Sequence, residues 1–386
     1  MIRQGIDILL QQNHLWKWQR IGLVTNEAAT DSQNKPSRQA LLQAGFNIIK
    51  LFSPEHGLDM IGADGAKMHD GIDELTKLPV ISLYGDKLQP TAEDLHDTDI
   101  LLFDIPDIGC RFYTYLWTMT HVLEACGKHN KRLVILDRPN PLSGNLQLAE
   151  GPMLDETNCA SFIGRWNIPL KHSCTIGELA LYFYRPKKIQ ADVEVIPCSG
   201  WNREMFQPDW GLTFVPTSPD MRSFDSALLY PGLGLLEATN ISMGRGTELP
   251  FQIAGAPWMN PEKIVAESNL PGVVLTPIHF TPTQSRYKNQ LCKGVKFDVA
   301  DKTSFHPVAT GLSFIKMIKD MYQSQFQWEP YSTNVNPSGR HHLDKLSGIF
   351  ESEQLFELSL TEFQRKIKYL TNIPSWENDI HPFLLY

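Results

Sequence analysis

The chain lacks several features that would place it in a specialised class of protein. No segment approaches the roughly 20 apolar residues that a membrane-spanning helix needs, and the N-terminus has no apolar core of a signal peptide. Positive charge is not in excess, since 35 Lys and Arg stand against 43 Asp and Glu, a formal net charge of −8. The sequence therefore predicts neither membrane insertion nor nucleic-acid binding.

Paired cysteines are also missing. The six cysteines are scattered and none forms a C-x-x-C pair, which favours free thiols in a reducing compartment. Together with the absent signal-peptide core, this predicts a cytoplasmic location for the chain as given, with the periplasm as the alternative if a leader was removed. No histidine or cysteine spacing is typical of a zinc site, so we expect no metal and no cofactor.

What the chain does contain is a series of short apolar runs separated by helix-length segments. Its 386 residues are enough for two domains. The expected strands are 20–26, 47–52, 78–84, 99–104 and 132–137, and the expected helices include 37–44 and 115–129. This alternation predicts an α/β fold with a Rossmann-like, doubly wound parallel sheet in residues 1–150 and a smaller α+β domain in residues 151–386. No G-x-G-x-x-G motif follows the first run, so a dinucleotide is not expected.

Polar side chains follow the apolar runs at the points where the predicted strands end. They are Thr25 and Asn26, then Glu55 and His56, then Tyr84, then Asp104 and Asp107, then Asp137, Arg138 and Asn140. Because the carboxyl ends of parallel strands open onto one edge of a sheet, these groups are expected to converge on one crevice. Glu55 and His56 stand out because Pro54 and Gly57 enclose them in an abrupt turn.

Two further polar blocks lie in the second half of the chain. His172 comes just before an expected helix with Thr175 as N-cap and Glu178 as its capping-box partner, so it either supports the fold or lines the crevice. In the other block, Asn240 precedes Arg245, which lies between two glycines that would let the backbone approach a ligand. A purely structural glycine-rich turn explains this block equally well.

Several blocks, in the same order along nearly the whole chain, resemble the NamZ-type exo-β-N-acetylmuramidase family. They are LFSPEHG (51–57), DIGCRFYTY (107–115), DRPNP (137–141), TIGELA (175–180), TNIS (239–242), GRGT (244–247) and GAPW (255–258). The resemblance implies a Rossmann-like N-terminal domain, a smaller C-terminal domain and an active site between them. It also implies removal of terminal N-acetylmuramic acid from the non-reducing end of peptidoglycan fragments, which would make muramyl saccharides the partner of this chain.

The resemblance assigns the role of catalytic glutamate to Glu55. The chemistry agrees, because breaking a glycosidic bond requires a group that protonates the leaving oxygen, and a carboxylic acid with a raised pKa suits that task. His56 is expected to tune Glu55 or to shuttle a proton. The second catalytic role stays open between Asp104 or Asp107, as nucleophile or base, and the substrate's own N-acetyl oxygen oriented by an acid.

Other residues are predicted to bind the sugar. Arg111 and Arg245 are candidates for holding the lactyl carboxylate, because a guanidinium binds a carboxylate in a planar fork. Tyr113, Asn140 and Asn240 are expected to contact sugar hydroxyls. Further lining residues are expected to be Asn26, Asp137, Arg138 and His172. The sequence does not determine the oligomeric state.

The chain departs from the family pattern close to Glu55. Asp59 and Met60 stand where the family has Arg-Gly after the motif that ends at Gly57, and the segment 61–65 is rearranged. Loss of that arginine removes one anchor for the lactyl group. A related N-acetylated acidic sugar is therefore an alternative substrate, and a non-catalytic glycan-binding or sensor protein is the alternative function.

Overall fold

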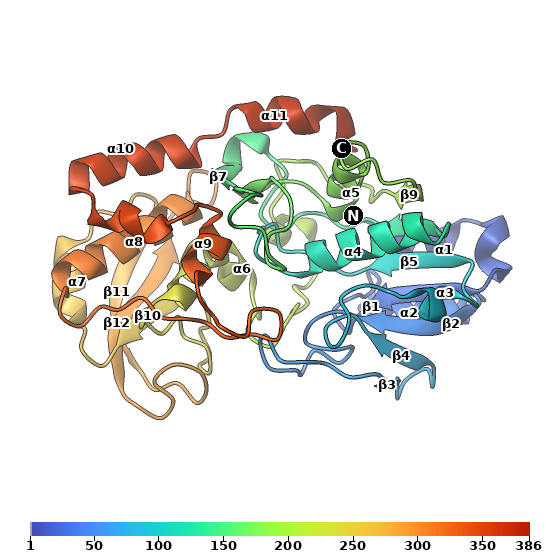
Figure 1. The fold of residues 1–386 in the computed structure, drawn as a ribbon, viewed down its shortest axis with the longest axis horizontal. Coiled ribbons are helices and arrows are strands. Elements are labelled where there is room, and N and C mark those ends of the chain that lie inside the picture. Colours follow the sequence, from blue (N-terminus) through green and yellow to red (C-terminus); the bar gives the residue numbers. More distant parts are fainter. Residues whose placement is uncertain (1) are drawn as a thin grey trace.

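The computed structural model describes residues 2–386 and contains two parts, each built on its own sheet (Figure 1). The N-terminal part has a seven-stranded sheet with the strand order β3-β4-β2-β1-β5-β6-β9. Its strands are β1 (Ile21–Thr25), β2 (Ile48–Ser53), β3 (Gly71–Ile72), β4 (Pro79–Ser82), β5 (Ile100–Asp104), β6 (Arg132–Leu136) and β9 (Asp192–Ile196). All neighbouring strands pair in parallel except β3 and β4. The predicted fold class is confirmed.

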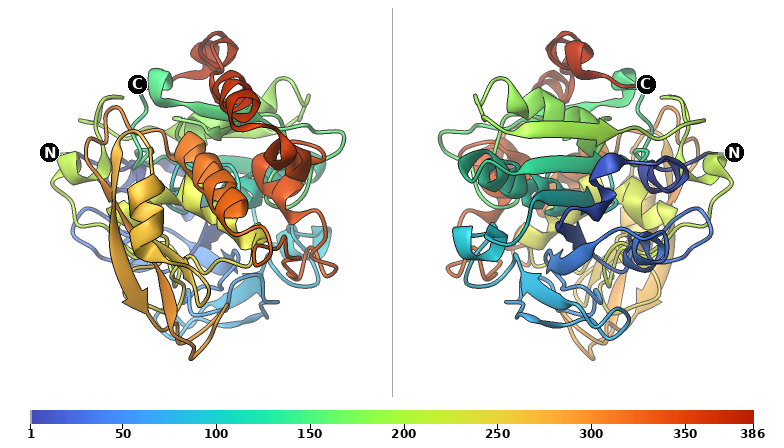
Figure 2. Two further views of the ribbon diagram at one scale, coloured as in Figure 1. Left: turned by 90° about the vertical axis from the view of Figure 1, so that its left-hand side faces the viewer. Right: turned by 90° about the vertical axis from the view of Figure 1, so that its right-hand side faces the viewer.

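Helices cover both faces of this sheet, as the apolar runs of the strands require. In β5, Leu101 and Phe103 belong to the core that includes residues of α4 (Tyr115–Lys128) and α5 (Ile176–Tyr184). The alternating residues Ile100 and Leu102 pack on the other face, with α1 (Gly5–Gln11) and α2 (Ser37–Gln43). Figure 2 shows the dark blue helices and the teal helix on opposite sides of the sheet. A strand that is buried on both faces explains why these runs are apolar throughout.

The predicted boundary between residues 150 and 151 divides the sheet, because β9 joins it next to β6. This edge strand, DVEVI, has acidic side chains and is only partly buried, so it lacks the apolar run that marks the other strands. The helix before it, α5, begins at the predicted N-cap Thr175 with the capping box to Glu178. The N-terminal part therefore extends well past residue 150.

The C-terminal part has a three-stranded antiparallel sheet, in the order β10-β12-β11, covered by helices. Two helices there, α6 and α8, cross at Gly232 and Gly311, where a Cβ on either residue would overlap the backbone of the other helix. Its elements are β10 (Ile253–Ala256), β11 (Val273–Phe280), β12 (Cys292–Val299), α6 (Phe224–Leu233), α7 (Pro261–Glu267), α8 (Pro307–Met321), α9 (His342–Ser347) and α10 (Leu360–Thr371). A third, two-stranded antiparallel sheet is formed by β7 (Glu150–Met153) and β8 (Pro169–Lys171), and α3 (Ala92–Leu95) is a short helix between β4 and β5.

The end of the chain returns to the N-terminal part through α11 (Ser375–Ile380) (Figure 1). The Tyr386 hydroxyl donates to Asp137 Oδ2 at 2.7 Å and accepts from the backbone N–H of Cys198 at 2.9 Å. Asp137 directly follows β6, so these bonds join the last residue to the edge of the large sheet. Within residues 2–386 no helix has both the length and the apolar character needed to cross a membrane. All six cysteines are buried and unpaired, as predicted.

The substitution Tyr386→Phe should lower the free energy of unfolding by about 1–3 kcal/mol, because it removes one hydrogen bond from the buried Asp137 carboxyl and leaves the Cys198 N–H without its partner. Urea denaturation would measure the change. Tyr369→Phe is the matched control, since Tyr369 is 75% exposed, and it should change stability by no more than about 0.5 kcal/mol. Equal stability of the two variants would show that the hydroxyl of Tyr386 does not anchor the chain end.

Candidate active site

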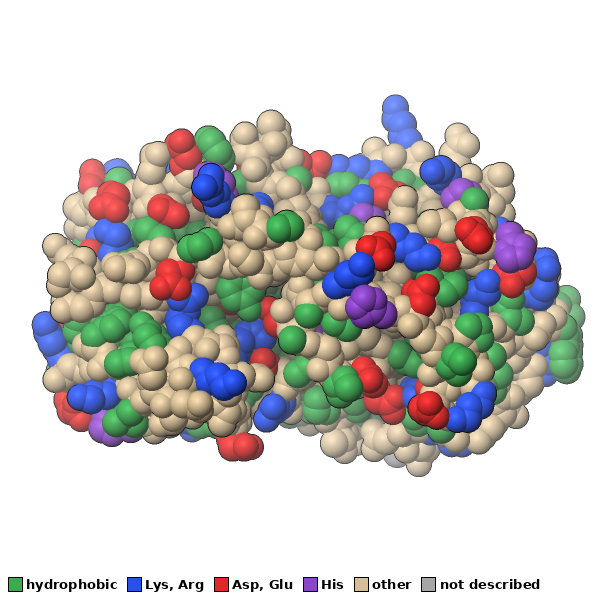
Figure 3. All heavy atoms as spheres, turned by 60° about the horizontal axis from the view of Figure 1, so that its bottom comes forward, with side chains coloured by type: hydrophobic (Ala, Val, Ile, Leu, Met, Phe, Trp, Pro, Cys, Tyr) green, Lys and Arg blue, Asp and Glu red, His purple; other side chains and the backbone are tan. Residues whose placement is uncertain are grey.

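A cavity of about 610 Å³ lies where the two parts meet. The N-terminal part contributes residues that follow β2, β4 and β5, and the C-terminal part contributes a separate group of charged and aromatic residues. The lining residues include Glu55, His56, Asp64, Tyr84, Tyr113 and Thr114 from the first group and Glu237, Arg245, Tyr331 and His342 from the second. On the face shown in Figure 3, acidic and basic side chains are interspersed rather than gathered by sign.

Glu55 reaches the cavity because the chain turns sharply after β2. His56 and Gly57 both have positive φ angles, 66° and 81°, which reverse the backbone directly after Glu55. The Glu55 side chain is held at both oxygens: Oε1 accepts from the Gly65 N–H at 2.9 Å, and Oε2 accepts from the Thr114 hydroxyl at 2.7 Å. With 5% of its surface exposed, Glu55 is fixed and almost fully buried.

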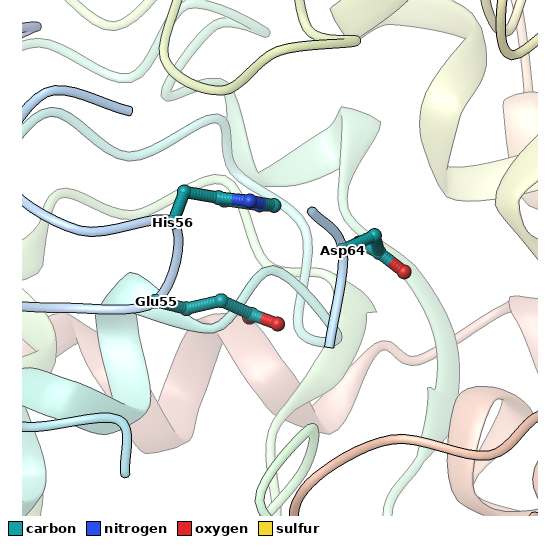
Figure 4. Close-up of side chains that lie close together, drawn as sticks. All are labelled: Glu55, His56 and Asp64. Atoms are coloured by element: carbon teal, nitrogen blue, oxygen red, sulfur yellow. The ribbon is translucent and has the colours of Figure 1, made fainter. Parts of the chain in front are cut away.

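His56 lies beside Glu55, and its ring orientation is also set by the backbone. Nδ1 is 2.8 Å from the carbonyl oxygen of Gly62, a contact that requires the proton on Nδ1. The other nitrogen, Nε2, is then left for the cavity. Figure 4 shows the two side chains extending in the same direction from one turn, with Asp64 across from them.

Asp64 is a site residue that the sequence analysis did not select. One of its oxygens, Oδ2, accepts from the Tyr331 hydroxyl at 2.6 Å, and Oδ1 is 3.3 Å from Nη2 of Arg245. One oxygen of Glu55, one oxygen of Asp64 and a ring nitrogen of His56 all lie within 4.8 Å of one another. The Asp64 side chain is still 30% exposed, so a ligand can touch it.

The environments of the two carboxyl groups push their pKa values in opposite directions. Burial raises the pKa of Glu55; the charge of His56 and the bonds from Thr114 and Gly65 oppose this, while the negative charge of Asp64 adds to it. Burial also disfavours ionisation of Asp64, but the charges of Arg245 and His56 and the bond from Tyr331 outweigh it and lower the pKa of Asp64. Such a pair offers one acid that keeps its proton and one carboxylate that has lost it.

Arg245 is placed in the cavity as predicted, but its surroundings do not match the predicted task. Both neighbouring glycines have a φ of 80°, and the guanidinium between them faces three carboxylates. Asp220 is at 2.9 Å, Glu237 at 2.7 Å and Asp64 at 3.3 Å. A cation that already pairs with three acids is suited to fixing those acids rather than to gripping a further carboxylate from a substrate.

The same three residues, Glu55, His56 and Asp64, are the one group within residues 2–386 whose donor atoms lie close enough to share a metal ion. The charge of Arg245 beside Asp64 and the raised pKa of Glu55 both oppose binding of a cation there. This donor set fits proton transfer better than metal coordination.

Two of the predicted catalytic acids do not reach this cavity. Asp104 is completely buried, and Arg138 binds it through Nε at 2.7 Å and Nη2 at 3.0 Å. Asp107 accepts from the backbone N–H of Gly109 at 2.7 Å and lies 3.4 Å from Nε2 of the buried His172. Asp107 and Arg138 instead face a second cavity of about 530 Å³ at the ends of β5 and β6. The structure thus gives these acids partners of their own.

Four more predicted binding residues use their side chains to hold the fold, outside the cavity lining. Asn26 Oδ1 accepts a hydrogen bond from the Ala28 N–H, and the Asp137 carboxylate accepts from Thr175, Gly177 and Tyr386. The Asn140 side chain forms hydrogen bonds with the backbone of Leu142 and Cys174. The Asn240 side chain does the same with Gln325 and Gln327. These bonds organise the loops after the strands. The strand-end side chains do not all converge on one crevice: Glu55, His56 and Tyr84 line the first cavity, Asp107 and Arg138 face the second, and the others hold the fold.

Arg111 is the clearest correction. Its guanidinium is fully buried and donates to four main-chain carbonyls, those of Pro152, Ile168, Leu346 and Ser347, at 2.6–3.1 Å. It therefore joins the N-terminal and C-terminal parts instead of lining the cavity. Tyr113 does line the cavity, and its hydroxyl donates to Thr217 Oγ1 at 2.6 Å.

Several cavity residues carry no signal that the sequence analysis could use. Glu237 and His342 are 105 positions apart yet lie 3.2 Å from each other, and the His342 ring stacks on Tyr331 at 4.8 Å. Asp64 follows Glu55 by nine positions in a glycine-containing loop, and this closeness in sequence was the one indication that it lies near Glu55. Tyr84 was expected among the strand-end groups, but no catalytic or binding role was predicted for it.

The structural role of Arg111 leads to a stability prediction. Arg111→Leu should lower the free energy of unfolding by at least about 3 kcal/mol, because four buried carbonyls lose their donor. Urea denaturation would measure it, with Arg365→Leu on the exposed face of α10 as a control that should change stability by no more than about 0.5 kcal/mol. A stable Arg111→Leu protein would show that Arg111 does not hold the two parts together.

Comparison with known proteins places the chain in a family. A model described as "Exo-beta-N-acetylmuramidase NamZ, N-terminal" matches residues 21–225, and its C-terminal counterpart matches residues 228–386. The chain is 43% identical over 332 residues to the peptidoglycan β-N-acetylmuramidase NamZ of Bacillus subtilis (strain 168), covering 85% of this chain and 80% of that protein.

Two solved structures have the same architecture. Both are crystal structures of DUF1343 family proteins from Bacteroides fragilis NCTC 9343, and each comparison covers 100% of this chain and 99% of the other. Their TM-scores are 0.88 and 0.75, at 30% and 28% identity. The two family models meet between residues 225 and 228, so the whole seven-stranded sheet falls within the N-terminal model. The predicted resemblance is confirmed: the chain belongs to the NamZ family of exo-β-N-acetylmuramidases.

Proposed function

We propose that this chain is an exo-acting glycoside hydrolase that removes terminal N-acetylmuramic acid from the non-reducing end of peptidoglycan fragments. The observation that carries the proposal is the pair of carboxyl groups in the cavity. Glu55 is buried with a raised pKa, and Asp64 beside it is held as a carboxylate. Glycosidic bond cleavage uses two carboxyl groups that differ in this way.

In the proposed reaction Glu55 is the general acid. Its proton passes to the oxygen of the glycosidic bond while the bond from that oxygen to C1 breaks, so the leaving sugar departs as a neutral alcohol. Glu55, now a carboxylate, takes a proton from the water that attacks C1 and returns to its starting state. The Gly65 N–H and the Thr114 hydroxyl keep the carboxyl in place through both steps.

The muramyl substrate is supported by the relationship to the Bacillus subtilis protein and by the character of the cavity. Aromatic residues that a sugar ring can pack against, including Tyr84, Phe112, Tyr113 and Phe251, line it together with charged residues. Because three acids already surround Arg245, His56 and His342 are the remaining cationic candidates in the lining for contact with the lactyl carboxylate.

The substitution Glu55→Gln tests the role of Glu55 as the general acid. For a disaccharide with muramic acid at its non-reducing end, kcat/KM should fall about 10²–10⁴-fold, the contribution of a positioned general acid. A 4-nitrophenyl muramyl glycoside should lose much less kcat/KM, because its leaving group needs no proton. Product release measured by chromatography and absorbance gives both numbers.

Glu74→Gln is the matched control, since the Glu74 side chain is 92% exposed, and it should leave both rates unchanged. Binding of the disaccharide without turnover in the wild type would contradict the proposed hydrolase and favour the non-catalytic alternative.

The pH dependence of kcat/KM follows from the raised pKa of Glu55. The reaction needs protonated Glu55, so kcat/KM should decline as the pH rises through its raised pKa, above the 4.5 that is usual for glutamate. The neighbouring charged groups are His56, which lowers this pKa, and Asp64, which raises it. A pH–rate profile whose alkaline limb lies at or below the usual glutamate value would contradict the role of Glu55.

A further inference from the structure

We infer that Asp64 is the second catalytic group: it binds the N–H of the sugar's 2-acetamido group, so that the acetamido oxygen attacks C1. This inference rests on the proposed function and assigns the role that the sequence analysis left open. The reaction would then pass through a cyclic intermediate made from the substrate itself, and the product would keep the β configuration.

The position of Asp64 suits this role. An Asp64 oxygen lies within 4.8 Å of both an oxygen of Glu55 and a nitrogen of His56, on the wall of the same cavity. An inverting enzyme needs roughly 6.5–9.5 Å between its two carboxyl groups to admit a water molecule between them. The spacing here is too short for that arrangement and favours retention of configuration.

The hydrogen-bond partners of Asp64 also suit this role. The Tyr331 hydroxyl donates a hydrogen bond to Oδ2, and Nη2 of Arg245 donates one to Oδ1, so each oxygen of Asp64 already accepts one hydrogen bond. These two hydrogen bonds stabilise the negative charge of Asp64 and make it a weak nucleophile toward carbon. Each oxygen still has a second lone pair that can accept a hydrogen bond from an N–H. A carboxylate held in this way is suited to orienting an amide.

The remaining acids near the cavity are committed elsewhere. Glu237 and Asp220 both pair with Arg245, and Glu237 also contacts His342. Asp104 and Asp107 do not line the cavity. Asp64 is therefore the partly exposed carboxylate closest to Glu55 in the lining, and the acetamido group is the nucleophile that every N-acetylmuramic acid residue supplies.

The proton of Glu55 goes to the glycosidic oxygen, and the C1–O bond electrons leave with it. The acetamido oxygen forms a bond to C1, and its nitrogen proton moves to Asp64, which leaves a neutral oxazoline. Water then gives a proton to Glu55 and attacks C1, the oxazoline C1–O bond breaks, and Asp64 returns the proton to nitrogen. Both acids end as they began.

Arg245 and Tyr331 act as positioning residues in this scheme. Tyr331→Phe removes the hydrogen bond to Oδ2 but leaves the ring that stacks on His342. It should lower kcat with little change in KM and should raise the pKa of Asp64, moving the acid limb of the pH–rate profile to higher pH. The groups around Asp64 that set this limb are Arg245, Glu55, His56, Tyr331 and His342. A purely structural role would move neither kcat nor that limb selectively.

The test uses the full-length protein and 4-nitrophenyl muramyl glycosides whose N-acetyl group carries zero to three fluorine atoms. Fluorine withdraws electrons from the acetamido oxygen, so kcat/KM should fall with each fluorine, and proton NMR should detect the β anomer as the first product. Asp64→Asn should lower kcat/KM for the acetyl substrate about 10²–10⁴-fold. Asp59→Asn, in the same loop and exposed, is the control and should behave as the wild type.

The outcomes separate the two claims. An α product, or a rate that is independent of fluorine in an active wild-type protein, would overturn the role of Asp64 and leave the proposed function standing. No hydrolysis of the unsubstituted glycoside by folded wild-type protein would overturn the proposed function, and this inference with it. The fluorine series needs no variant, so misfolding of Asp64→Asn cannot decide the result.

Discussion

The site depends on one electrostatic relationship, the closeness of two carboxyl groups whose surroundings raise the pKa of Glu55 and lower the pKa of Asp64. Ionising both of two carboxyl groups whose oxygens lie within 4.8 Å is unfavourable because the negative charges repel each other, and the surroundings decide which group ionises first. Glu55 is enclosed by neutral donors, whereas Asp64 faces a guanidinium and a tyrosine hydroxyl. Arg245 is the largest of the contributions that favour the negative charge on Asp64, and His56, Tyr331 and His342 act in the same direction.

This relationship requires both parts of the chain. Glu55, His56 and Asp64 come from loops after β2, while Arg245 and Tyr331 come from the C-terminal part. The backbone of Asn334 also donates to the Gly65 carbonyl at 2.7 Å, next to the N–H that binds Glu55. Arg111 and the bond between Tyr386 and Asp137 join the same two parts elsewhere. The relative positions of the site residues therefore depend on the contacts that join the two parts.

Much of the fold was predictable because buried parallel strands need apolar runs, and their ends mark one edge of the sheet. The same reasoning found Glu55 and His56. It failed for Arg111, since an arginine that holds buried carbonyls and an arginine that faces a cavity look alike in sequence. It also missed Glu237, Tyr331 and His342, whose meeting depends on tertiary packing across more than a hundred residues. The edge strand β9 was missed because its polar residues hide the strand pattern.

The protonation states of Glu55 and Asp64 are the most direct test of this account. Carbon-13 NMR of protein labelled at the carboxyl carbons of glutamate and aspartate, with Glu55→Gln and Asp64→Asn to assign the two signals, would follow each group through a pH titration. We expect Glu55 to titrate above the usual glutamate value of 4.5 and Asp64 below the usual aspartate value of 3.8. A Glu55 signal that is ionised at low pH while Asp64 stays protonated would contradict the account.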